Sequence, residues 1–241
     1  FFRVRATNDS GDLNYNYVTS LGAQTYFYVS CSVSGSFYVA SSSIPSRAGM
    51  DCRGTATIPQ GITEARINAF APGSAATQTN RYLTGLVFPP SGFASIDQGG
   101  FRNLGLTSVT IPASVIMVGL SAFENNPLTS VTITGASGGA STFLSQGAFN
   151  NQNALFGTTT AVALTLGSGK IEIGHNFGAN TTFSSIDFGT GIAEIGERAF
   201  YQNGIANGWV PIFPPTIKTI GSGAFGNSPN LKTIRFGSST S

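Results

Sequence analysis

One feature of this 241-residue chain constrains its fold more than any other: a phrase that returns along the sequence. Residues 106–123 read LTSVTIPASVIMVGLSAF, and much of this pattern returns over residues 183–200 as FSSIDFGTGIAEIGERAF. Part of it returns over residues 214–225 as PPTIKTIGSGAF. Self-similarity at a fixed short period is typical of a solenoid, in which each unit buries its apolar face only by stacking on its neighbours.

Each unit opens with a strand-like phrase, such as Leu106/Val109/Ile111, in which inward apolar residues alternate with outward Ser or Thr. A turn with Pro or Gly follows. A second apolar phrase, such as Ile192/Ile195, comes next and often ends in Gly. The first phrase recurs at Leu128/Val131/Ile133, Phe183/Ile186/Phe188 and Leu231/Ile234/Phe236.

A phenylalanine closes each unit, and the intervals between successive phenylalanines run from 22 to 31 residues. The residues are Phe70, Phe101, Phe123, Phe149, Phe177, Phe200 and Phe225. We expect each ring to occupy the same height in its coil and to stack near the next ring, which gives a spine of buried aromatic side chains. Intervals longer than about 25 residues indicate insertions.

An asparagine follows each phenylalanine by two or three positions from the second unit onward. These are Asn103, Asn125, Asn151, Asn180, Asn203 and Asn227. An inward amide at the corner of a coil would hydrogen-bond backbone groups that otherwise cost about 1–3 kcal/mol each when buried without a partner. The alternative is that asparagine is simply a common turn residue. The regular offset favours a structural ladder.

This pattern resembles the BspA-like leucine-rich repeats, which occur in secreted and surface proteins. The resemblance rests on LTSVTIPASV (residues 106–115), IGERAF (195–200) and IGSGAFGNSPNL (220–231). It implies a mainly β leucine-rich-repeat solenoid with a sheet along one side and short strands and helical turns along the other. Asn126, Gln152 and Ser228 stand where the family often has Cys. The family has no catalytic motif to transfer.

The resemblance divides the chain in two. Residues 55–241 form about seven repeats and a final partial one, and residues 1–54 lack the repeat. Residues 25–44 alternate with a period of two around Gly35 and Ser36, which predicts a β-hairpin. We expect this segment to be an N-terminal β cap on the first coil. A small separate β-domain or a degenerate first repeat is the alternative.

The composition favours an extracellular or surface location. Only 9% of the residues are charged, against about 25% in an average soluble domain. The net charge of +2, without a basic cluster, gives no footprint for nucleic acid. Both cysteines, Cys31 and Cys52, precede the repeats. In an oxidising compartment they would form a disulfide; otherwise they are two buried thiols.

Residues for catalysis or metal binding are sparse. His175 is the only histidine, and the two cysteines lie far from it in sequence, so we expect neither a Ser-His-Asp relay nor a zinc site, and no cofactor. Residues 8–12 (NDSGD) offer oxygen ligands but lack the EF-hand spacing and are typical of a turn. Glu172 and Glu194 occupy equivalent places in two units, so they should share a face some coils apart.

Two sequons are candidate glycosylation sites, at Asn8 and Asn180, in a host that glycosylates secreted proteins. Chance sequons are common in a chain so rich in Asn, Ser and Thr. Asn180 is also a candidate for the ladder, and one amide cannot serve both roles.

The two ends of the solenoid differ. The chain begins at Phe1 without Met, which suggests a processed product or a fragment, and no polar cap follows the last strand phrase. An uncapped coil exposes apolar side chains and strand edges, so we expect a chain continuation or a neighbouring subunit to cover it. The expected interface joins Leu231, Ile234 and Phe236 at one end to Tyr26, Tyr28 and Phe37 at the other.

Three functions remain open. The first is a non-enzymatic extracellular protein for surface display, adhesion or protein–protein interaction, with a protein or glycan partner. The second is a structural subunit of an extracellular filament, sheath or virion appendage, built by stacking repeats. The third is a fragment of a larger enzyme or toxin. The repeats favour the first two, because solenoids act mainly through surfaces.

Overall fold

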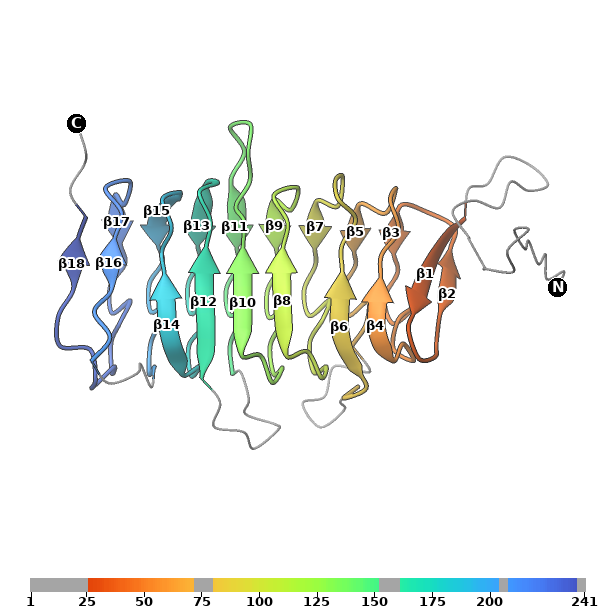
Figure 1. The fold of residues 1–241 in the computed structure, drawn as a ribbon, viewed down its shortest axis with the longest axis horizontal. Coiled ribbons are helices and arrows are strands. Elements are labelled where there is room, and N and C mark those ends of the chain that lie inside the picture. The colour runs from red at the N-terminus through yellow and green to blue at the C-terminus, as the bar shows by residue number, and fades with distance from the viewer. Residues whose placement is uncertain (1–25, 72–79, 152–160, 204–207, 238–241) are drawn as a thin grey trace, which may run out of the picture.

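The computed structural model describes residues 26–71, 80–151, 161–203 and 208–237. These residues form an elongated stack of coils in which two layers of strands face each other (Figure 1). An eight-stranded sheet makes one layer. Its strands, in order along the stack, are β3 (Ser43–Ile44), β5 (Glu64–Ala65), β7 (Ser95–Ile96), β9 (Met117–Val118), β11 (Thr142–Leu144), β13 (Ile171–Ile173), β15 (Ile192–Ile195) and β17 (Thr219–Ile220).

Three smaller sheets make the other layer. One contains β8 (Ser108–Ile111), β10 (Ser130–Ile133), β12 (Val162–Leu166) and β14 (Phe183–Asp187). A second contains β2 (Phe37–Val39), β1 (Phe27–Cys31), β4 (Gly54–Thr57) and β6 (Leu83–Val87). The third pairs β16 (Ile212–Phe213) with β18 (Arg235–Phe236).

The strands of successive coils pair in parallel and in register. Val109 of β8 lies beside Val131 of β10, which lies beside Leu164 of β12. All three side chains are buried, whereas Ser and Thr alternate with them on the outside. The alternation of the first phrase therefore places at least two apolar side chains per strand in a continuous core between the layers.

The phenylalanine rings form a column through that core. The centroids of successive rings from Phe70 to Phe225 lie 4.9–5.7 Å apart. The rings up to Phe200 are at most 2% exposed, and Phe225 in the last of these coils is half-buried. Contacts at this separation are favourable for aromatic pairs, so the column connects every repeat to the next.

Helical turns were expected around these rings, but the described residues contain no helix. The segments around these rings form reverse turns instead. Around Phe123, the amide of Ala122 donates to the carbonyl of Gly119, and that of Glu124 donates to that of Ser121. Ser121 has a φ of 53° and Asn125 a φ of 56°. A left-handed residue on each side of the ring prevents helical propagation.

The N-terminal end is closed by antiparallel strands. β1 pairs antiparallel with β2, with which it forms a hairpin, and antiparallel with β4 on its other side. β4 in turn pairs in parallel with β6. The predicted mainly β solenoid is thus confirmed, and an antiparallel hairpin lies at its N-terminal end. The first strand of the eight-stranded sheet, β3, lies within residues 1–54, the segment predicted to be the cap.

A disulfide joins the cap to the coils. Cys31 at the end of β1 is bonded to Cys52, two residues before β4, with Cα atoms 5.5 Å apart. Both side chains are buried. Of the two alternatives for the cysteines, the bridged one is therefore found, and it connects the hairpin covalently to the start of the solenoid.

Across the described ranges, no helix has the length and hydropathy that a membrane span requires.

Candidate functional site

The outer side chains of the eight-stranded sheet form a row across its strands. Pairing places Phe143 between Met117 and Glu172, and continues through Glu194 to Thr219. We call these five residues rim A. Each belongs to a different coil, and neighbouring parallel strands lie about 4.8 Å apart, so rim A is a line of side chains along the solenoid axis.

A second row runs beside the first, at the turn that follows each strand. The carbonyls of Leu120, Gln146, His175, Glu197 and Ser222 each accept a hydrogen bond from an amide of the preceding coil. We call these five residues rim B. All five are exposed, and each lies three positions after its partner in rim A.

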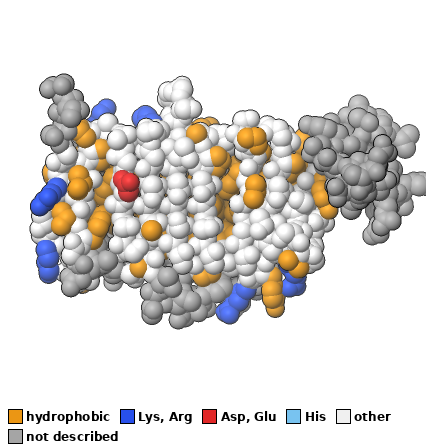
Figure 2. Space-filling model, in the orientation of Figure 1, with side chains coloured by type: hydrophobic (Ala, Val, Ile, Leu, Met, Phe, Trp, Pro, Cys, Tyr) orange, Lys and Arg blue, Asp and Glu red, His pale blue; other side chains and the backbone are white. Residues whose placement is uncertain are grey.

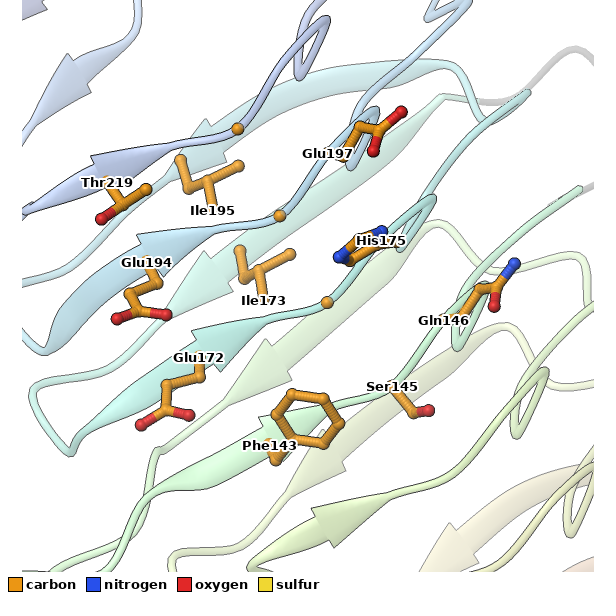
Figure 3. Close-up of a pocket in the computed structure, with 13 residues that line it drawn as sticks. Phe143, Ser145, Gln146, Glu172, Ile173, His175, Glu194, Ile195, Glu197 and Thr219 are labelled. Atoms are coloured by element: carbon orange, nitrogen blue, oxygen red, sulfur yellow. The ribbon is translucent and has the colours of Figure 1, made fainter.

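From β11 to β17 the two rims enclose a shallow groove of about 630 Å³ (Figure 3). Met117 and Leu120 continue the rims beyond the β11 end of this groove. Phe143, Glu172, Glu194 and Thr219 line one side, and Gln146, His175 and Glu197 line the other. Ser145, Gly174, Gly196 and Gly221 lie between them, and Ile173 and Ile195 point into the core.

The glycines between the rims are required by the stacking of the coils. A Cβ at Gly174 would lie 2.5 Å from the carbonyl oxygen of Leu144, and one at Gly196 would lie 2.6 Å from the carbonyl carbon of Gly174. Side chains do not fit at such distances from backbone of the neighbouring coil. As a result, the space between the rims stays free of side chains over three successive coils.

The chemistry of the rims changes along the axis. At the β9 end the exposed side chains are apolar: Ile116 is 47% exposed, Met117 40%, Leu120 38% and Phe143 38%. Neighbouring large apolar side chains on a surface indicate a contact site more often than isolated ones do. Toward β15 the rims become acidic, with Glu172 and Glu194 on one side and Glu197 on the other.

The cations near these carboxylates lie outside the groove lining. Lys170 Nζ is 3.2 Å from Glu172 Oε1, and Arg198 Nε is 3.8 Å from Glu197 Oε1. A hydrogen bond from Ser141, supported by Lys170, holds the pKa of Glu172 below its ordinary value of 4.5. Glu172 therefore keeps its negative charge at a lower pH than an unperturbed glutamate.

The structure brings together three residues that the sequence singled out for different reasons. Glu172 and Glu194 share one face, on neighbouring strands of the eight-stranded sheet. His175 lies opposite them on rim B, between Gln146 and Glu197 (Figure 3). The described ranges contain no group of three or more His, Cys, Asp or Glu side chains placed to hold a metal ion.

The asparagines of the expected ladder differ in how deeply they are buried. Asn103, Asn125 and Asn203 are buried, and the Asn125 amide donates to Asn103 Oδ1 at 3.1 Å. Asn151 is half-buried and donates to Glu124 Oε1, whereas Asn180 and Asn227 are exposed. Asn103, Asn125, Asn151, Asn180 and Asn227 all have φ between 51° and 59°. These five asparagines therefore share a left-handed backbone conformation in the turn, which asparagine tolerates well.

Backbone contacts of the kind expected of the ladder are also made by neighbouring polar residues. Asn126 donates to the carbonyls of Phe101 and Phe123 at 2.9 and 2.8 Å. Ser228 donates to the carbonyl of Phe200 at 3.4 Å. Asn126 and Ser228 both stand where the related repeats often have Cys. This difference from the family was the feature of the sequence that distinguished these two residues. An inward polar side chain there satisfies a buried carbonyl of the preceding coil.

The residues of the expected assembly interface lie at opposite ends of the stack (Figure 1). At the β18 end, Ile234 is 45% exposed and Phe236 61% exposed, with Ile212 of β16 60% exposed beside them. Leu231 is half-buried there, as are Tyr26, Tyr28 and Phe37 at the cap end.

The sequons fall on different parts of the chain. Asn180 and Thr182 are exposed, so the second sequon is accessible in the folded chain, and glycosylation there stays a prediction. Asn8 and the loop at residues 8–12 lie outside the described residues.

The fold and the repeated turns define a leucine-rich-repeat solenoid. The family described as "BspA type Leucine rich repeat region" matches residues 74–156 and 151–241. The chain belongs to this family.

One similar solved structure is a leucine rich cell surface protein from Faecalibacterium prausnitzii A2-165, with 16% sequence identity and a TM-score of 0.30. The match covers 80% of this chain and 63% of that one, so this chain spans less than two thirds of that protein. No curated protein matches the sequence.

Proposed function

We propose that this chain is a non-enzymatic extracellular repeat protein that acts in surface display, adhesion or protein–protein interaction. Its binding surface is the outer face of the eight-stranded sheet, and the groove between rims A and B is the centre of that surface. The observation that carries the proposal is the run of exposed apolar side chains at the β9 end of the two rims, next to the groove. Apolar side chains this exposed contribute to stability mainly when a partner covers them.

The opposite face supports this choice of surface. There the outward residues of β8, β10 and β12 are Ser108, Thr110, Ser130, Thr132, Ala163 and Thr165. Figure 2 shows that face, which is mostly uncharged and polar over these strands. Small hydroxyl side chains offer few of the aromatic and charged anchors that dominate the energy of protein interfaces.

The disulfide and the composition support the extracellular location. Disulfides persist in oxidising compartments and are rare in the cytosol. The Cys31–Cys52 bridge and a charged fraction of 9% are both typical of a secreted or surface-displayed domain.

The test is a binding assay on a panel of immobilised extracellular-matrix proteins and glycans. We expect the chain to bind at least one panel member, and M117S/F143S to weaken that binding by about tenfold or more, since two partly buried anchors are lost. V87S is the matched control, because Val87 is 48% exposed on the opposite layer. Equal losses in both variants, or no binding to any panel member, would contradict the proposal.

A second proposal, self-association by stacking, rests on the β18 end. Ile212, Ile234 and Phe236 are all 45% or more exposed, and β18 presents an edge strand. Edge strands beside apolar side chains tend to pair with another chain. A second copy whose Tyr26, Tyr28 and Phe37 meet Leu231, Ile234 and Phe236 would give a head-to-tail polymer.

This stacking proposal predicts that I234D abolishes self-association. A charge placed in an apolar contact is strongly destabilising unless it is paired. The measurement is the sedimentation velocity of the wild type and the variant over a range of concentrations. I67D, at a residue that is 50% exposed on another part of the surface, is the control and should behave as the wild type. A wild type that stays monomeric at high concentration would leave surface display as the better explanation.

A further inference from the structure

The groove has a direction, because its two ends have different chemistry. We propose that it binds an extended segment of a partner protein that runs along the solenoid axis. The segment places an apolar side chain against Met117, Leu120 and Phe143, and arginine or lysine side chains over β13 and β15. This inference rests on the proposed function and names the class of partner for the same site.

The length of the two rims fits an extended segment. From the coil of β9 to the coil of β17 there are four steps of about 4.8 Å, or roughly 19 Å. An extended polypeptide advances about 3.3 Å per residue, so about six residues span this distance. Because the middle of the groove lacks side chains at Gly174, Gly196 and Gly221, a main chain can lie there between the rims.

The charge of the groove selects a basic segment. Three of the thirteen residues that line it are glutamates, and none is Lys or Arg. Glu172 pairs with Lys170 and Glu197 with Arg198, so among the described residues Glu194 is the groove carboxylate without an ion pair. Glu194 on β15 lies across the groove from Glu197, which is in the turn that follows this strand. A guanidinium group between them would form charge-assisted hydrogen bonds to carboxylates, which are stronger than bonds between neutral groups.

The apolar end is an independent observation that favours a protein partner. Met117 and Phe143 are paired neighbours on β9 and β11, and Leu120 lies opposite them on rim B. Methionine adapts to irregular apolar surfaces, and phenylalanine adds a rigid aromatic face. An apolar side chain next to cationic side chains is a combination that a peptide segment supplies. A neutral glycan does not supply it.

The experiment is a selection of random heptapeptides, displayed on phage, against the immobilised full chain. We expect enriched peptides to carry Lys or Arg at a constant distance from an apolar residue. A synthetic peptide of the enriched sequence is then measured against the wild type and the variants E172Q/E194Q/E197Q and M117S/F143S, with V87S as the control. Thermal unfolding of each variant verifies that it is folded.

The expected results separate the two ends of the groove. The triple glutamine variant should bind the peptide at least tenfold more weakly and lose most of the salt dependence, which reports charge pairing. M117S/F143S should also weaken binding but keep the salt dependence. The same peptide with its sequence reversed should bind more weakly than the original, since the groove has a direction.

Other outcomes would overturn the inference. Enrichment of neutral or acidic peptides that still depend on Met117 and Phe143 would retain the outer face as a binding surface but exclude a basic partner. A glycan array is probed in parallel. If a neutral glycan binds, and M117S/F143S abolishes that binding, the outer face is likewise retained as a binding surface and a basic partner is excluded. No enrichment, or binding unchanged in both groove variants, would overturn the peptide site and leave the panel assay to test the surface.

Discussion

Replacing Phe123 by alanine should destabilise the chain by about 3–5 kcal/mol, the usual cost of truncating a buried aromatic side chain. The ring is fully buried, with its centroid 5.4 Å from that of Phe101 and 4.9 Å from that of Phe149. Both neighbouring rings are nearly parallel to it, at 16° and 7°. Its removal leaves a cavity and interrupts the column in the middle of the stack. Urea unfolding followed by circular dichroism gives the change in free energy.

F143A is the matched control for this prediction. Phe143 is the same residue type, 38% exposed on rim A, and truncating it should cost less than about 1 kcal/mol. If F123A and F143A destabilise the chain equally, or if F123A costs less than about 1 kcal/mol, the column is not a main source of stability.

Removing the disulfide should cost about 3 kcal/mol. Cys31 and Cys52 are 21 residues apart in sequence, and a crosslink that closes a loop of this length lowers the entropy of the unfolded chain by roughly that amount. The C31S/C52S variant should therefore unfold at a lower urea concentration than the wild type. Hydrogen exchange should become faster first in β1 and β2, which the bridge connects to the coils.

Reduction supplies the control for the cysteine variant. Wild-type chain in reducing agent should match C31S/C52S, and the variant itself should not respond to the reducing agent. A variant as stable as the oxidised wild type would show that the hairpin is held by its contacts with β4 alone.

Much of the fold follows from the amino-acid sequence. The alternation in LTSVTI and its copies predicts strands, and the repeated phenylalanine predicts a column of rings, since identical positions in stacked coils must meet. The hairpin around Gly35 follows from its period of two. In each case the information is local: a few neighbouring residues decide which side chains face inward.

In the turns, the local sequence pattern was not sufficient to predict the backbone conformation. Ser121 and Asn125 both adopt left-handed backbone conformations, so the segment around Phe123 forms two reverse turns and no helical turn. The asparagines were expected to bond the backbone, yet Asn126 does so in this coil. Both amides are buried and adjacent in sequence, and only the path of the turn decides which one meets the backbone of the preceding coil.

By itself, the sequence determined that this chain is a leucine-rich-repeat solenoid, because stacking of like units is a consequence of the repeat alone. Only the tertiary structure decided which outer side chains share a groove. The intervals between repeats vary from 22 to 31 residues, so the loops that absorb the difference set the register between coils. That register places Met117, Phe143, Glu172 and Glu194 on one rim, although 22 to 29 residues separate each from the next.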